Sequence, residues 1–165
     1  MEIIVKAERK ILWASDFSEM SIEALKTTQV LSFIPQQELI ALHIIENPMD
    51  NLYKPEDSVP INRLTHAEDI VKEKFKKIFE EFGIAPKFYR IEVLTIEIGK
   101  HAGDKIIEVA DKEKVWLIIM GREAKGMKRL LGSTTEYVLA HAKCPILIVR
   151  GKIDEEIFEG HPRLK

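Results

Sequence analysis

The sequence has one cysteine, no long apolar run and no excess of either charge. A single cysteine, Cys144, cannot form a disulfide within the chain and is typical of a reducing compartment. No apolar run approaches the roughly 18 residues that span a bilayer, and residues 1–10 are too charged for a signal peptide. With 25 basic and 27 acidic residues, no bulk charge attracts nucleic acid. We therefore expect a cytoplasmic protein that neither crosses a membrane nor binds nucleic acid.

The signatures of several common enzymes are also missing. The sequence has no Gly-x-x-x-x-Gly-Lys-Ser/Thr loop, no Gly-x-Gly-x-x-Gly fingerprint, no Gly-x-Ser-x-Gly elbow and no His-Glu-x-x-His pair. No candidate nucleophile stands beside an orienting base in any recognisable pattern. We therefore expect no catalytic residues and no metal site, and an enzyme that hydrolyses ATP weakly or transfers a nucleotidyl group is the alternative.

Short strand-like runs alternate with helical patterns along the chain. The apolar runs that predict strands are residues 11–14, 39–45, 91–98, 115–120 and Ile146–Val149. Helical patterns follow Ser18, cover 66–82, follow Asp104 and cover 133–142. This alternation predicts an α/β fold, a doubly wound five-stranded parallel sheet of order 3-2-1-4-5 with helices on both faces. The 165 residues suit one domain, residues 1–150, with 151–165 as a polar tail or dimer arm.

A glycine-bearing basic loop follows the fourth predicted strand. Gly121 ends that strand, and Gly132, Ser133 and Thr134 open the next helical pattern. Glycine lets a backbone approach a ligand closely, and a helix start offers free N–H groups and partial positive charge. The loop therefore has the character of a phosphate cradle.

A second loop, residues 15–18, follows the first predicted strand. In doubly wound sheets, ligands bind at the carboxyl ends of the strands, where the winding direction reverses. With the order 3-2-1-4-5, loops 15–18 and 121–132 are neighbours across that point. We therefore expect one crevice between them.

Several residues have two readings. Asp16 either accepts a hydrogen bond from a ligand or supports a turn. The Gly132–Thr134 start either holds an anion or only caps its helix, and the basic loop either clamps phosphates or is simply exposed. His43 is expected to be a hydrogen-bonded core histidine, and His101 a loop histidine. Trp13, Trp116 and Cys144 are expected to be packing residues.

Four segments in the same order resemble the universal stress protein family. They are residues 10–19 (KILWASDFSE), 41–46 (ALHIIE), the 120–134 loop and 144–149 (CPILIV). The likeness covers about residues 10–150, with 47–90 the loosest part. It implies a homodimer that pairs its last strands, here Ile146–Val149, and an unknown protein partner.

The resemblance also implies where a nucleotide would lie. In family members that bind ATP, positions matching Ala14, Asp16 and Ile44 surround the adenine. Positions matching Gly121, Gly132, Ser133 and Thr134 hold the phosphates, with Mg²⁺ where ATP is bound. Arg122 and Lys125 supply positive charge for those phosphates.

One feature departs from the ATP-binding pattern, which is glycine, two residues, glycine, nine residues, glycine, then Ser or Thr. Here the second glycine is replaced by Ala124, and only seven residues separate it from Gly132. Three hypotheses therefore stand. They are a stress-response module that binds an adenine nucleotide, a dimeric scaffold of the same fold without ATP binding, and an enzyme that hydrolyses ATP weakly or transfers a nucleotidyl group.

Overall fold

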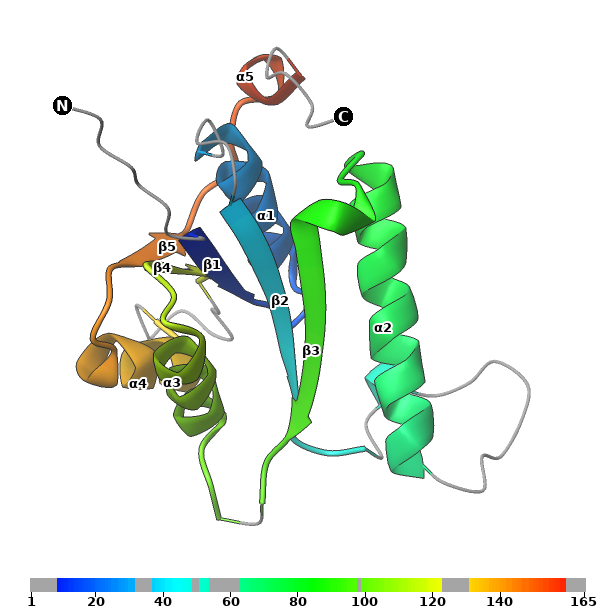
Figure 1. The fold of residues 1–165 in the computed structure, drawn as a ribbon, viewed down its shortest axis with the longest axis vertical. Helices are drawn as coiled ribbons and strands as arrows, with labels where there is room; N and C mark the ends of the chain where they lie inside the picture. The colour runs from blue at the N-terminus through cyan, green and yellow to red at the C-terminus, as the bar shows by residue number, and fades with distance from the viewer. Residues whose placement is uncertain are drawn as a thin grey trace, which may run out of the picture.

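The computed structural model describes residues 9–31, 37–48, 51–53, 63–97, 99–122 and 131–159 (Figure 1). Its strands are β1 (Arg9–Ala14), β2 (Gln37–Ile45), β3 (Tyr89–Thr95), β4 (Leu117–Gly121) and β5 (Ile146–Val149). Its α-helices are α1 (Glu19–Leu31), α2 (Arg63–Glu81), α3 (Ala102–Glu113), α4 (Ser133–His141) and α5 (Glu155–Glu159). Short 3-10 turns lie at Asn51–Tyr53 and Pro86–Phe88. No described helix is long and apolar enough to cross a membrane.

The five strands form one parallel sheet in the order β3-β2-β1-β4-β5, which confirms the predicted topology. β1 lies at the centre, paired with β2 on one side and β4 on the other. The winding direction reverses at β1, so the crevice expected by the switch-point rule lies at its carboxyl end. β3 and β5 are the two edge strands.

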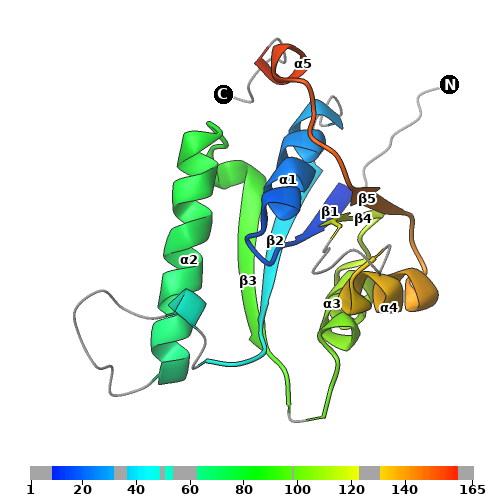
Figure 2. The same cartoon turned by 180° about the vertical axis from the view of Figure 1, so that it is seen from behind.

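Two hydrophobic layers cover the two faces of the sheet. Helices α1 and α2 pack on one face, where Trp13 is fully buried and contacts Phe75 and Phe79 edge-on. Helices α3 and α4 pack on the other face, around Leu12, Ile40 and Ile118. Figures 1 and 2 show the sheet between these two pairs of helices. Strands buried on both faces explain why β1, β2 and β4 are almost continuously apolar.

Local sequence signals account for the ends of the helices. Ser18 Oγ accepts a hydrogen bond from Ser21 N at 3.3 Å, so the expected cap of α1 is confirmed. Gly83 follows α2 with φ of 65°, a left-handed conformation that favours glycine. The predicted apolar stripe of this helix faces the core, since Val71, Phe75 and Phe79 have no exposed surface.

Three expectations were wrong in detail. Trp116 is 40% exposed because it precedes β4, which begins at Leu117. Helix α3 is capped by His101, and Asp104 completes a capping box instead of being the cap. Helix α4 has Gly132 at its N-cap position with no side-chain hydrogen bond, so Ser133 and Thr134 lie inside the helix and do not cap it.

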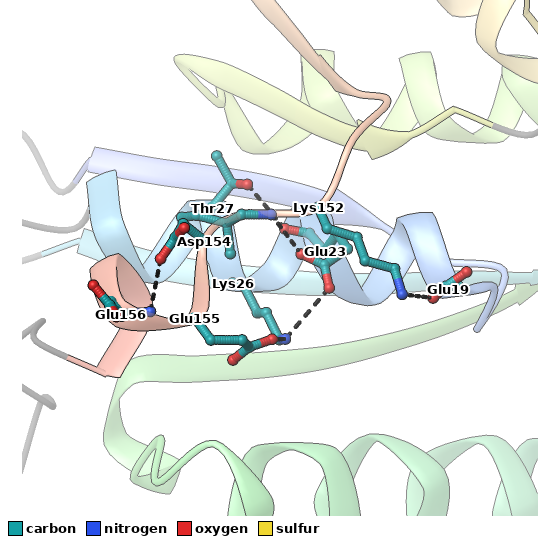
Figure 3. Close-up of polar contacts among 9 residues, drawn as sticks. Glu19, Glu23, Lys26, Thr27, Lys152, Asp154, Glu155 and Glu156 are labelled. Atoms are coloured by element: carbon teal, nitrogen blue, oxygen red, sulfur yellow. Dashed lines mark hydrogen bonds and ion pairs between the residues drawn. The ribbon is translucent and has the colours of Figure 1, made fainter.

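The segment after β5 folds back along α1 (Figure 3). The buried carboxylate of Glu23 accepts a hydrogen bond from Ile153 N at 3.0 Å. Lys26 Nζ lies 3.3 Å from Glu23 and 2.8 Å from Glu155. Residues 152–155 of this segment therefore pack on α1 of the same chain. The role of residues 151–165 as a dimer arm stays a prediction.

Candidate functional site

A pocket opens to solvent at the carboxyl ends of β1, β2 and β4. The first turns of α3 and α4 complete its wall. The residues that line it are Ala14, Ser15, Asp16, Leu42, His43, Ile44, Glu46, Ala102, Ile106, Met120, Gly121, Thr134 and Thr135. The pocket therefore lies at the topological switch point, and residues from both predicted loops meet in it.

The pocket brings together five of the nine candidate residues. Ala14, Asp16, Ile44, Gly121 and Thr134 all line it. Three others do not line the described pocket: Gly132 and Ser133 at the start of α4, and Arg122 directly after β4. Lys125 and Ala124 lie outside the described residues.

The loop between β1 and α1 is held by its own side chains. Ser15 Oγ accepts a hydrogen bond from Phe17 N at 3.1 Å, and Asp16 Oδ1 accepts one from Ser18 N at 2.9 Å. Ser21 Oγ donates to Ser15 Oγ at 2.6 Å. Phe17 has φ of 62°, a left-handed conformation that is costly for a bulky side chain. Asp16 thus supports the turn, and it also lines the pocket, where its hydrogen bond to a ligand stays a prediction.

His43 fixes this loop from the neighbouring strand. Its Nδ1 lies 2.7 Å from the carbonyl oxygen of Ser15, so Nδ1 carries the proton and donates it. Its Nε2 lies 2.7 Å from the hydroxyl of Tyr53, which therefore donates to it. Burial lowers the pKa of His43, and the hydrogen bond to Ser15 only partly offsets this. The expectation of a hydrogen-bonded core histidine is confirmed.

Gly121 is required by packing against α1. A Cβ at this position would lie 2.5 Å from the carbonyl oxygen of Met20, and even closer to the backbone at Ser21. Real Cβ atoms do not approach backbone this closely, so β4 and α1 can meet only at a glycine. Gly121, which the sequence analysis expected to contact phosphates, therefore has a structural role in packing β4 against α1.

Three kinds of surface line the pocket. Apolar side chains of the layer covered by α3 and α4 form its apolar floor, among them Ala14, Ile44, Ile106 and Met120. The carboxylates of Asp16 and Glu46 offer hydrogen-bond acceptors. At the start of α4, Thr134 and Thr135 offer hydroxyls next to N–H groups that no side chain caps.

Sequence reasoning missed the wall made by the first turn of α3. Ala102 and Ile106 lie four residues apart on one helix face, so both reach the pocket. The signal was present, because this helix starts at the carboxyl end of β3 in the same sheet. Among the described residues, no group of three His, Cys, Asp or Glu side chains could hold a metal ion.

The comparisons with known proteins agree with this architecture. Residues 8–150 match the Universal stress protein family. A universal stress protein of Methanocaldococcus jannaschii is 31% identical over 146 residues, covering 86% of this chain and 82% of the relative. A second one from the same organism is 28% identical over 162 residues, covering 87% of this chain and 96% of the relative.

Solved structures share the fold. That of a Methanocaldococcus jannaschii protein superposes with a TM-score of 0.61 at 27% identity, covering 89% of this chain and 99% of the other. Two family structures at 19% and 16% identity, each with a TM-score of 0.57, are complexes with cAMP and with dAMP, the latter from Archaeoglobus fulgidus. They cover 86% and 87% of this chain, and 96% and 98% of their own chains. The family match over most of the chain, together with the sheet order, shows that this chain belongs to the universal stress protein family.

Proposed function

We propose that this protein is a cytoplasmic, dimeric stress-response module that binds an adenine nucleotide. The observation that carries the proposal is the convergence of Asp16, Ile44, Gly121 and Thr134 on one pocket at the switch point. Two structural relatives that are complexes with adenine nucleotides support it. The protein acts by binding, and the nucleotide-dependent state of the site provides the signal.

The pocket surfaces suggest an orientation for the nucleotide. The adenine lies on the apolar floor near Ala14 and Ile44, with its amino group toward Asp16. The phosphates lie toward Thr134 and the start of α4, where the helix dipole favours negative charge. Gly132, Ser133, Arg122 and Lys125 belong to this phosphate end, and Mg²⁺ accompanies the phosphates when ATP is bound.

Calorimetric titration tests the proposal. We expect adenosine, AMP and Mg-ATP to release or absorb heat at about 0.1 mM protein, where a Kd near 1 mM is the practical limit. Asp16→Asn separates the two roles of the residue, because its amide oxygen still accepts from Ser18 N while its charge is gone. Asp16→Ala removes both. Absence of heat with all three ligands would contradict the proposal.

A second candidate is a dimeric scaffold of the same fold that does not bind ATP. The observation that favours it is the sequence departure at Ala124, with only seven residues before Gly132. Gly121 does not decide between the two, because its packing on α1 requires glycine in either case. If the scaffold reading is correct, Ala124→Gly together with two inserted loop residues should create ATP binding that the native chain lacks.

The proposal also includes a dimer and no ATP hydrolysis, and each of these can be tested. β5 (Ile146–Val149) is an edge strand, and an unpaired edge is suited to pairing with a second copy of the chain. Sedimentation of wild type and Ile148→Pro tests this, since proline removes a backbone donor from the edge. The weak hydrolase alternative predicts steady ADP release that is lost in Asp16→Ala, and we expect none.

A further inference from the structure

The first turn of α3 depends on the side chain of His101. This residue occupies the N-cap position, and its Nδ1 accepts a hydrogen bond from Gly103 N at 3.0 Å. Asp104 Oδ2 accepts a hydrogen bond from His101 N at 3.2 Å, which completes the capping box. Histidine is an unusual choice for this position, where Ser, Thr, Asp and Asn dominate.

A tyrosine from α4 clamps this turn. The ring of Tyr137 stacks on His101 at 4.6 Å between centroids, with 16° between the planes. Its hydroxyl donates a hydrogen bond to Asp104 Oδ1. A Cβ on Gly103 would lie 2.9 Å from Cγ of this ring, so the turn and the ring are in close contact. The clamp thus joins the first turn of α3 to α4.

The clamped turn is also a wall of the pocket. Ala102 directly follows His101 and lines the pocket, as does Ile106 one turn later. Thr134 and Thr135, on the helix that carries Tyr137, line it as well. A change in the capping of α3 at His101 should therefore shift Ala102, the next residue in the chain, and with it the lining of the pocket.

The cap works in only one protonation state. Nδ1 can accept from Gly103 N only when it carries no proton, and a protonated imidazole has two N–H groups and no acceptor. Serine, threonine, aspartate and asparagine caps keep their acceptor near neutral pH, whereas a histidine loses the acceptor when it binds a proton. On these grounds we propose that neutral His101 is a positioning residue for the nucleotide pocket, and that its protonation loosens the α3 wall and weakens nucleotide binding. This inference rests on the nucleotide-binding function proposed above.

The ionisable groups around His101 come from its own segment and from α4. Its own segment contributes Asp104, with Lys100 and Lys105 nearby. The hydrogen bond from Tyr137 lowers the pKa of Asp104, and the same bond raises the pKa of Tyr137. Neither group therefore changes charge between pH 5 and 8.

The other face of Tyr137 provides a matched control. His141 stacks there at 4.1 Å, and its Nδ1 lies 2.8 Å from the carbonyl oxygen of Tyr137. Here the ring nitrogen donates, so protonation at Nε2 preserves the bond. Two histidines thus sandwich one tyrosine, and only His101 loses its hydrogen bond on protonation.

The experiment compares adenosine affinity at pH 7.5 and 5.5, because adenosine has no group that titrates in this range. We expect wild type to bind adenosine about fivefold more weakly at pH 5.5 than at pH 7.5. Loss of one helix cap costs about 1 kcal/mol, and this changes the equilibrium between the ordered and the loosened α3 wall about fivefold. His101→Asn supplies a cap that does not titrate, and its affinities at the two pH values should be equal. His141→Asn should retain the fivefold difference.

Amide spectra give a readout that needs no ligand. In wild type, the exchange protection of the Gly103 N–H and the chemical shifts of the Ala102 and Ile106 amides should differ between pH 7.5 and pH 5.5. In His101→Asn they should be constant. Constant signals in wild type, or equal pH profiles for wild type and His101→Asn, would overturn the role of His101. Absence of adenosine binding at pH 7.5 in every variant would instead overturn the nucleotide-binding function.

Discussion

His43 Nδ1 lies 2.7 Å from the carbonyl oxygen of Ser15, and this bond ties β2 to the loop that leaves β1. The same ring accepts the hydroxyl of Tyr53 through Nε2 at 2.7 Å, so both of its nitrogens are satisfied inside the protein. Phe17 lies against the ring at 4.9 Å. One buried imidazole therefore sets the position of Asp16, which stands between Ser15 and Phe17 at the mouth of the pocket.

Replacing His43 with alanine should destabilise the fold. The change leaves the Ser15 carbonyl and the Tyr53 hydroxyl without this partner in a buried site, and such groups cost about 1–3 kcal/mol each. We expect the free energy of unfolding in urea to fall by about 3 kcal/mol. Tyr53→Phe removes the bond at Nε2 but leaves the bond between Nδ1 and Ser15, and it should cost about 1 kcal/mol. Equal losses for the two variants would contradict the central role of the imidazole.

The same residue predicts how stability depends on pH. Because burial lowers the pKa of His43 in the folded state, the unfolded chain binds its proton more readily. The contribution of neutral His43 is therefore complete above the unfolded pKa of about 6.5 and is lost as the pH falls below it. We expect the free energy of unfolding to decrease by up to about 1.4 kcal/mol per pH unit in that window. His43→Gln should lack this part of the slope in denaturation curves between pH 5 and 8.

Substitution by alanine should lower the melting temperature at Gly121 but not at Gly151. At Gly121 the new Cβ would collide with the backbone of Met20 and Ser21, whereas at Gly151 nothing lies within 4 Å. Overpacking of this kind costs about 1–3 kcal/mol, so Gly121→Ala should lower the melting temperature by several degrees. Gly151→Ala should leave it within about 2 °C. A neutral Gly121→Ala would mean that α1 and β4 are more loosely packed than the structure indicates.

The sequence predicted the fold correctly where burial determines the pattern of apolar and polar residues. The strand order, the central place of β1 and the meeting of the two loops follow from apolar runs, turn residues and the winding rule. The pattern also identified Ser18 as a cap and His43 as a core residue. These features are local, or are determined by the order of elements alone.

The missed features depend on which side chains meet across elements. The cap of α3 was expected at Asp104 because aspartate is a common cap and histidine is not. The ring of Tyr137 that stacks on His101 comes from 36 residues further along the chain. Trp116 seemed part of an apolar run, but the strand starts one residue later and leaves the indole 40% exposed. Residues 151–165 carry no periodic pattern, so the docking of Ile153 on Glu23 was not foreseeable.

That docking yields the last prediction, a contrast between two carboxylates of α1. Glu23 is buried and accepts from Ile153 N and Lys26, whereas Glu19 pairs with Lys152 in a bridge whose side chains are 67% and 66% exposed. Exposed pairs contribute about 0–1 kcal/mol, while loss of one partner in a buried charged bond costs more. Glu23→Gln should therefore lower the free energy of unfolding by about 1–2 kcal/mol and speed amide exchange at Ile153, because the neutral amide is a weaker acceptor. Glu19→Gln should change stability by less than about 0.5 kcal/mol and leave that exchange rate unaltered. If both variants behave alike, the segment after β5 is held by general charge attraction and not by the specific bond to Glu23.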